Sequence, residues 1–140
     1  MNIDPSSALV GTWRLLSVHV EMADGGERVD LLGTNPVGRM IIAGDGQMIC
    51  ILTGDNGSRA EQPQSAGPLF YAGKYRTENG DKVIVKCDVA WNPAWVGAEQ
   101  VRFFKLQGDK LSIRSGLVTH PALAGQQGYG VIDWQREPSI

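Results

Sequence analysis

The sequence predicts an all-β protein, an antiparallel barrel of eight strands. Its 140 residues include 18 glycines and 7 prolines, which divide the chain into short segments along its whole length. The segments are rich in Val, Ile, Tyr, Phe and Trp, which favour strands, and a helical period is almost absent. A long antiparallel sheet tends to close on itself because closure removes its exposed edges. A sandwich of two sheets is the alternative architecture.

Eight strands are expected in chain order, each bounded by residues that favour turns. A short extra strand at 27–31 is left open. The eight expected strands cover residues 12–21, 38–43, 47–52, 71–77, 82–89, 98–106, 110–115 and 128–136.

The connections between these strands are of two kinds. Residues 44–46, 78–81 and 108–109 contain Gly with Asp or Asn and predict tight hairpins, because these residues adopt positive φ angles readily. Residues 53–69 are polar and rich in Gly, Pro and Ser, which predicts a long loop that acts as a mobile lid. Since no linker or fixed repeat divides the chain, residues 1–140 are expected to form a single domain.

Composition and charge exclude several classes of protein. The net charge of -2 disfavours nucleic acid as a partner, because phosphate contacts need a basic surface. No apolar run approaches the roughly 18 residues of a membrane span, and residues 1–7 lack the pattern of a signal peptide. Two cysteines are too few for a disulfide scaffold. We therefore expect a cytoplasmic protein that binds neither nucleic acid nor membranes.

Strand alternation assigns one face of each strand to the barrel interior. The predicted lining is mostly apolar, with two phenols. Phe103 or Phe104 also points inward, and alternation does not decide which; Phe104 is taken as the lining residue. The other lining residues are Met40, Met48, Tyr71, Tyr75, Val85, Cys87, Leu111 and Ile113.

The first strand admits two interpretations. If Trp13 points inward, alternation sends Ser17 and His19 inward with it, as polar groups in an apolar interior. Burying such groups without a partner costs roughly 1–3 kcal/mol, so they would call for a ligand. The alternative places Val18 and Val20 inside and Ser17 and His19 outside.

A set of motifs in a fixed order resembles the bacterial and fungal lipocalin-like domain family. The first motif is Gly11-Thr12-Trp13, and the resemblance extends over nearly the whole chain. The later segments read NPVGRMI at 35–41, YAGKY at 71–75, NPAWVGAEQVR at 92–102 and DWQR at 133–136.

This resemblance implies an antiparallel lipocalin-like barrel of eight to ten strands with an interior cavity for a small, mostly apolar molecule. It also implies that a basic residue late in the chain, here Arg136, packs across the opening Trp13 and closes the barrel. The expected partner is therefore a small hydrophobic molecule, and a homodimer is left open.

Three further sets of residues are candidates for chemistry. An isomerase, cyclase or hydro-lyase that works without a metal in the same cavity is the alternative function, with His19, Tyr71 and Tyr75 as acid–base candidates. His120 is an exposed loop residue or, in a third hypothesis, a haem ligand. The spacing of the two histidines does not suggest a metal site, and no cofactor is expected.

One charged side chain of the sixth strand is also expected to point inward. Glu99 and Arg102 fall on opposite faces of this strand, so one of them faces the interior. A buried charge needs a partner, and Asp88 or Asp133 on neighbouring strands is a candidate for Arg102. A structural ion pair and a clamp for a substrate carboxylate are the two alternatives.

Overall fold

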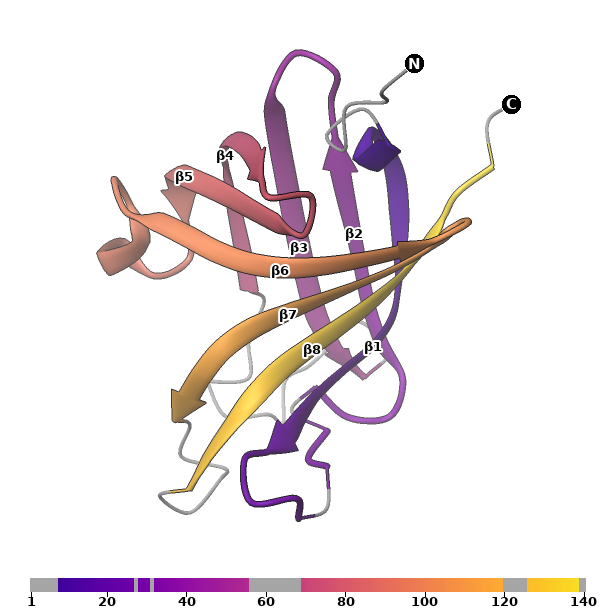
Figure 1. Ribbon diagram of the computed structural model, residues 1–140, viewed down its shortest axis with the longest axis vertical. Helices are drawn as coiled ribbons and strands as arrows, with labels where there is room; N and C mark the ends of the chain where they lie inside the picture. The colour runs from indigo at the N-terminus through magenta and orange to yellow at the C-terminus, as the bar shows by residue number, and fades with distance from the viewer. Residues whose placement is uncertain (1–7, 27, 31, 56–68, 120–125, 139–140) are drawn as a thin grey trace.

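A computed structural model describes residues 8–26, 28–30, 32–55, 69–119 and 126–138 (Figure 1). Its eight strands follow one another in chain order around a closed antiparallel barrel, and β8 pairs with β1 to complete it. A closed barrel rules out the two-sheet sandwich. The strands are β1 (Gly11–Met22), β2 (Pro36–Ile42), β3 (Gln47–Asp55), β4 (Leu69–Glu78), β5 (Lys82–Ala90), β6 (Glu99–Gln107), β7 (Lys110–Thr119) and β8 (Gln127–Arg136).

The eight predicted strands are confirmed, although most extend further than predicted. The predicted extra strand at 27–31 is reduced to a single bridge, in which Val29 pairs with Val20 of β1. The turn between β4 and β5 has positive φ angles at Asn79 and Gly80, as its sequence predicts. Residues 56–68 of the predicted lid at 53–69 lie outside the described residues. The two ends of the predicted lid belong to strands, since β3 continues to residue 55 and β4 begins at 69.

One end of the barrel is closed by the two ends of the described chain. The guanidinium carbon of Arg136 lies 4.3 Å from the ring centroid of Trp13, which confirms the predicted closure contact. Its two terminal nitrogens donate hydrogen bonds of 2.7 Å to the carbonyl oxygens of Val10 and Ala8. Gly11 has a φ of +149°, and a Cβ there would lie 2.7 Å from Arg136 Nη1. A side chain at the Gly position of the Gly-x-Trp motif would therefore collide with Arg136.

A β-bulge in β1 changes which residues face the interior. Leu15 pairs with Trp134 of β8, but Ser17 pairs with Asp133, so Leu16 is an extra residue. Trp13 and Leu15 point inward before the bulge, and Val18 belongs to the same core after it. The first interpretation is therefore right for Trp13, before the bulge, and the second is right for Val18, after it. Each is wrong for the rest of the strand because each assumes unbroken alternation.

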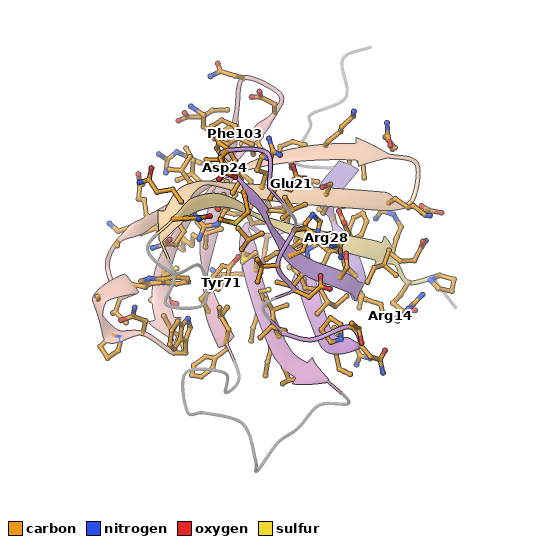
Figure 2. The ribbon with its side chains drawn as sticks, turned by 90° about the horizontal axis from the view of Figure 1, so that it is seen from below. Arg14, Glu21, Asp24, Arg28, Tyr71 and Phe103 are labelled. Carbon is orange, nitrogen blue, oxygen red and sulfur yellow. The ribbon has the colours of Figure 1, made fainter. Side chains whose placement is uncertain are left out.

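Alternation also holds along most of the other strands, although the β2–β3, β4–β5 and β7–β8 pairs have register shifts, and most charged side chains lie on the outer face. Arg14, on the face of β1 opposite Trp13, lies at the periphery of the molecule (Figure 2). A further irregularity lies between β4 and β5, where Asp88 of β5 is an extra residue and a Cβ at Gly73 of β4 would lie 1.9 Å from the carbonyl oxygen of Lys86. The backbones of β4 and β5 approach here as only glycine permits.

Candidate functional site

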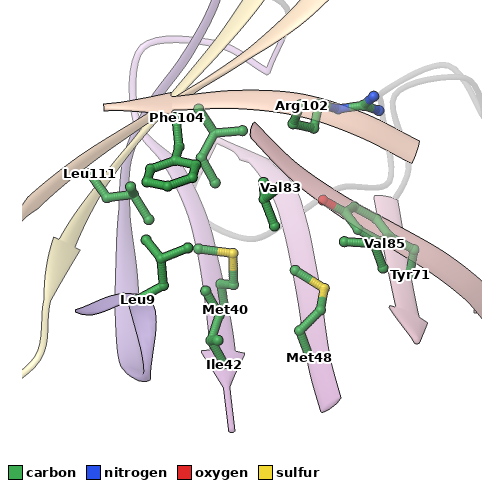
Figure 3. Close-up of a pocket in the computed structure, with 11 residues that line it drawn as sticks. Leu9, Met40, Ile42, Met48, Tyr71, Val83, Val85, Arg102, Phe104 and Leu111 are labelled. Carbon is green, nitrogen blue, oxygen red and sulfur yellow. The ribbon is translucent and has the colours of Figure 1, made fainter. Parts of the chain in front are cut away.

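Side chains from six strands and the turn before β1 converge on a pocket at the centre of the barrel (Figure 3). Strand alternation brings them there, since each strand contributes one or two residues from its inner face. The lining residues are Leu9, Met40, Ile42, Met48, Tyr71, Val83, Val85, Arg102, Phe104, Leu111 and Ile113.

The pocket is small. Its open volume is about 10 Å³, which is about the space that one water molecule needs. An interior cavity of ligand size, as expected from the sequence, is not shown. The sulfur side chains of Met40 and Met48 fill part of the space, and each has three rotatable bonds. A larger molecule therefore enters only if such side chains move.

Seven of the predicted lining residues lie around this pocket. Cys87 is part of the same buried core without lining the pocket, and Tyr75 packs against that core. Of the two phenylalanines, Phe104 points inward and Phe103 is 42% exposed. The seven are Met40, Met48, Tyr71, Val85, Phe104, Leu111 and Ile113; their role in binding stays a prediction.

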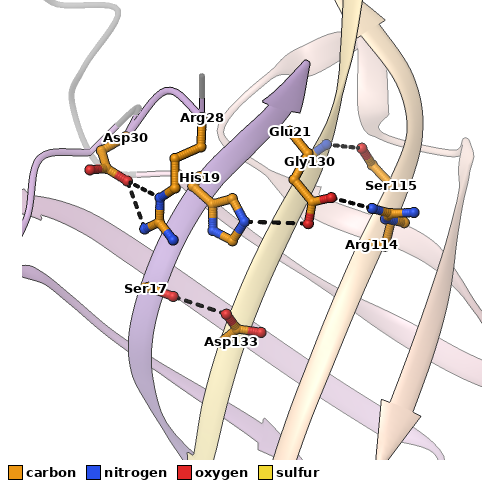
Figure 4. A network of polar contacts seen from close by, with 9 residues as sticks. All are labelled: Ser17, His19, Glu21, Arg28, Asp30, Arg114, Ser115, Gly130 and Asp133. Carbon is orange, nitrogen blue, oxygen red and sulfur yellow. Dashed lines mark hydrogen bonds and ion pairs between the residues drawn. The ribbon is translucent and has the colours of Figure 1, made fainter. Parts of the chain in front are cut away.

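Ser17 and His19 do not face the interior, so their predicted placement in the lining is wrong. After the bulge in β1 they point to the outer face, where Ser17 donates a 3.0 Å hydrogen bond to Asp133. His19 Nε2 lies 3.6 Å from Glu21 Oε1, and Glu21 in turn pairs with Arg114 at 2.6 Å (Figure 4). His19 is only 7% exposed although it lies outside the barrel. These residues form a polar network on the surface of β1, β7 and β8.

Of the three acid–base candidates, Tyr71 lines the pocket. Its hydroxyl is in hydrogen-bonding contact with the Cys50 thiol, and burial raises the pKa of both groups, that of Cys50 to about 12. Both groups therefore keep their protons at neutral pH, which suits Tyr71 as a hydrogen-bond donor and not as a base. The hydroxyl of Tyr75 donates instead to the backbone carbonyl of Ala43 at 3.0 Å.

Arg102 is the charged residue of β6 that faces inward, whereas Glu99 lies on the outer face. Glu99 accepts hydrogen bonds of 2.8 and 3.3 Å from Arg76, and this pair lowers the pKa of the Glu99 carboxyl. Arg102 makes hydrogen bonds to the Val101 carbonyl and the Gln100 side chain. The predicted ion pair of Arg102 with Asp88 or Asp133 does not form in the described part of the chain.

Some of the pocket residues that the prediction missed could have been found from the sequence, and others could not. Ile42 and Val83 follow from alternation along β2 and β5 and could have been found. Leu9 could not, because it enters the barrel from the turn before β1 rather than from a strand. Arg102 was recognised as one of two inward candidates, and the register of β6 settles the choice.

The described residues bear on a metal site but do not test the haem hypothesis. No group of three His, Cys, Asp or Glu side chains in that part of the chain is arranged to hold a metal ion. His120, the candidate haem ligand, lies outside the described residues. Among the described segments there is no helix of the length and apolar character that crossing a bilayer requires.

The fold and the pocket define the class of protein, a small closed antiparallel barrel with an apolar centre and one end sealed by an arginine over a tryptophan. The chain belongs to the lipocalin-like domain family, whose model matches residues 10–137. The resemblance seen in the sequence is therefore confirmed over nearly the whole chain.

Comparison with curated proteins finds no match. Among solved structures, a redesigned beta barrel is 15% identical, with 96% of each chain covered and a TM-score of 0.48. An uncharacterized protein from Bacteroides eggerthii is 11% identical, with 91% of this chain and 98% of that chain covered and a TM-score of 0.45. The family match is thus what identifies the chain.

Proposed function

We propose that the protein binds a small hydrophobic molecule at the centre of its barrel. The observation that carries this proposal is the pocket itself, where apolar side chains of six strands converge on one point. Small-molecule sites are usually concave and apolar with a few polar groups, and an eight-stranded barrel encloses space for side chains or one small ligand. Membership of a lipocalin-like family supports the same function.

Binding on this proposal is coupled to movement of side chains in the pocket. Because the open volume is about 10 Å³, a ligand must displace atoms that now fill the centre. Met40 and Met48 are the residues best suited to move, since an unbranched thioether changes rotamer at little cost. The sealed end at Trp13 stays fixed, so we expect entry from the opposite end of the barrel, where residues 91–98 connect β5 to β6.

Acid–base catalysis in the same pocket, the alternative from the sequence, has Tyr71 as its one remaining candidate there. His19 faces outward and the Tyr75 hydroxyl is bonded to a backbone carbonyl. Burial raises the pKa of the Tyr71 hydroxyl, so this lining residue keeps its proton and is not a base at neutral pH. Binding is therefore the function that we advance.

The test combines native mass spectrometry with calorimetry. The purified protein is examined for a bound small molecule, and it is then titrated with octanol and decanol. We expect one molecule per chain and a negative heat-capacity change, which is the mark of apolar burial.

A matched pair of variants on β5 locates the site. Val85 is 2% exposed in the pocket, and Val89 is 53% exposed on the outer face of the same strand. Val85→Phe should abolish or greatly weaken binding, because its larger ring takes the space that the ligand needs. Val89→Phe should bind as the wild type does. Equal binding by both variants, or no binding by the wild type, would count against a site inside the barrel.

A further inference from the structure

Arg102 lines the apolar pocket from the inner face of β6, and its side chain is half-buried. It alternates with Gln100 and Phe104 along the inner face of β6, while Val101 and Phe103 are exposed on the outer face. Figure 3 shows it across the pocket from Leu9, on the same side as Tyr71. Strand alternation thus places Arg102 on the same face of β6 as Phe104, while its guanidinium extends away from Phe104 and Leu9.

The partners of Arg102 are all uncharged. One terminal nitrogen donates to the Val101 carbonyl at 2.9 Å and the other to Gln100 Oε1 at 3.2 Å. The guanidinium carbon lies 6.0 Å from the ring centroid of Trp95. None of the ion pairs formed by the described residues includes Arg102. Its positive charge is therefore not balanced by a carboxylate in that part of the chain.

The nearby polar groups in the interior do not balance this charge either. The Cys50 thiol and the Tyr71 hydroxyl both interact electrostatically with Arg102, which favours their ionisation. Burial acts more strongly in the opposite direction and raises the pKa of each group, so both stay neutral. Asp133 is engaged with Ser17 on the outer face, and Asp88 is exposed.

The surroundings of Arg102 suit the head group of an amphiphile. Trp95 and Tyr71 meet edge to face at 5.7 Å and form an aromatic wall beside the guanidinium. A guanidinium has five N–H donors in a planar fork that matches the two oxygens of a carboxylate. Apolar side chains, among them Met48 and Phe104, continue from this wall toward the sealed end.

We propose that the ligand is a monovalent organic acid, whose carboxylate pairs with Arg102 and whose hydrocarbon body lies among Met40, Met48 and Phe104. This inference rests on the proposed function and adds the chemical class of the ligand. A carboxylate at this position would satisfy donors of Arg102 that have only neutral partners, and the pair would be strengthened by its partly buried setting. The neutral Tyr71 hydroxyl is a donor on the same side of the pocket.

The test compares acids with alcohols of equal chain length. Hexanoate, octanoate and decanoate and the matched alcohols are titrated by calorimetry into the wild type, Arg102→Gln and Arg39→Gln at constant ionic strength. Arg39 is exposed on β2, so its variant has the same change in net charge without a change inside the barrel. The wild type and Arg39→Gln should bind the best acid about tenfold or more tightly than its alcohol, as a charge-assisted pair predicts.

Arg102→Gln should lose this preference and still bind the alcohol within about twofold of the wild type, since the apolar contacts remain. Arg102→Leu is a second variant that leaves no polar head group inside, and circular dichroism checks that both fold. If acids and alcohols bind the wild type equally, or if both Arg102 variants keep the preference for acids, the inference is wrong although binding stands. If neither acids nor alcohols bind, the proposed function itself fails.

Discussion

Replacing Arg136 by Met removes the guanidinium that covers Trp13 at one end of the barrel and leaves the aliphatic part of the side chain in place. Four contacts are lost. The stack on Trp13 at 4.3 Å is worth about 1 kcal/mol, and each of the two 2.7 Å hydrogen bonds to backbone carbonyls adds about 1 kcal/mol or more. The ion pair with Asp109 adds little, because the Asp109 side chain is 70% exposed. We expect a loss of about 3 kcal/mol.

Urea unfolding followed by tryptophan fluorescence measures this loss. With a slope of about 2 kcal/mol per molar, the midpoint should fall by about 1.5 M. Arg14→Met is the control, because the Arg14 side chain is about half exposed and lies 3.6 Å from a Glu137 oxygen. It should stay within about 0.5 kcal/mol of the wild type. A midpoint for Arg136→Met equal to that of Arg14→Met would refute the role of Arg136 in closing the barrel.

Two further predictions concern the backbone and the interior. Gly73→Ala should lower the free energy of unfolding by about 3 kcal/mol or prevent folding, whereas Gly44→Ala, which meets open space, should be nearly neutral; thermal unfolding distinguishes them. Because burial raises the pKa of Cys50 from 9.0 to about 12, the folded state holds this proton more tightly than the unfolded state. The stability that this provides is present below pH 9 and is lost as pH rises toward 12, so Cys50→Val should unfold with a shallower dependence on pH in that range. Parallel slopes for Cys50→Val and the wild type in alkaline urea titrations would contradict this second prediction.

The barrel and its order of strands could be predicted because turn residues and strand formers alternate along the whole chain. The faces of a strand could be predicted only where its alternation is unbroken. In β1 the extra residue Leu16 reverses the faces, and no residue type in the sequence marks that bulge. Ser17 and His19 were misplaced for this reason, although Trp13 was placed correctly.

The interior site was partly predictable for similar reasons. In β6 both Phe103 and Phe104 are apolar, so only the pairing with β5 and β7 shows which of them faces inward. The same pairing decides that Arg102 points inward and Glu99 outward. The size of the pocket depends on side-chain rotamers, which a pattern of residue types does not determine.

The hydrogen bonds from Arg136 to the carbonyls of Ala8 and Val10 hold the two ends of the barrel together, so ring closure joins the first strand of the barrel to the eighth. The barrel cannot close before β8 has formed, and this pairing joins the strands that lie furthest apart in the sequence. Joining the ends through a short linker and opening the chain at the turn of residues 44–46 would keep every strand neighbour, turn the β1–β8 pairing into a local hairpin and make β2–β3 the pairing between the first and last strands. Such a circular permutant should form the same barrel at a similar rate, because one pairing still spans the whole ring.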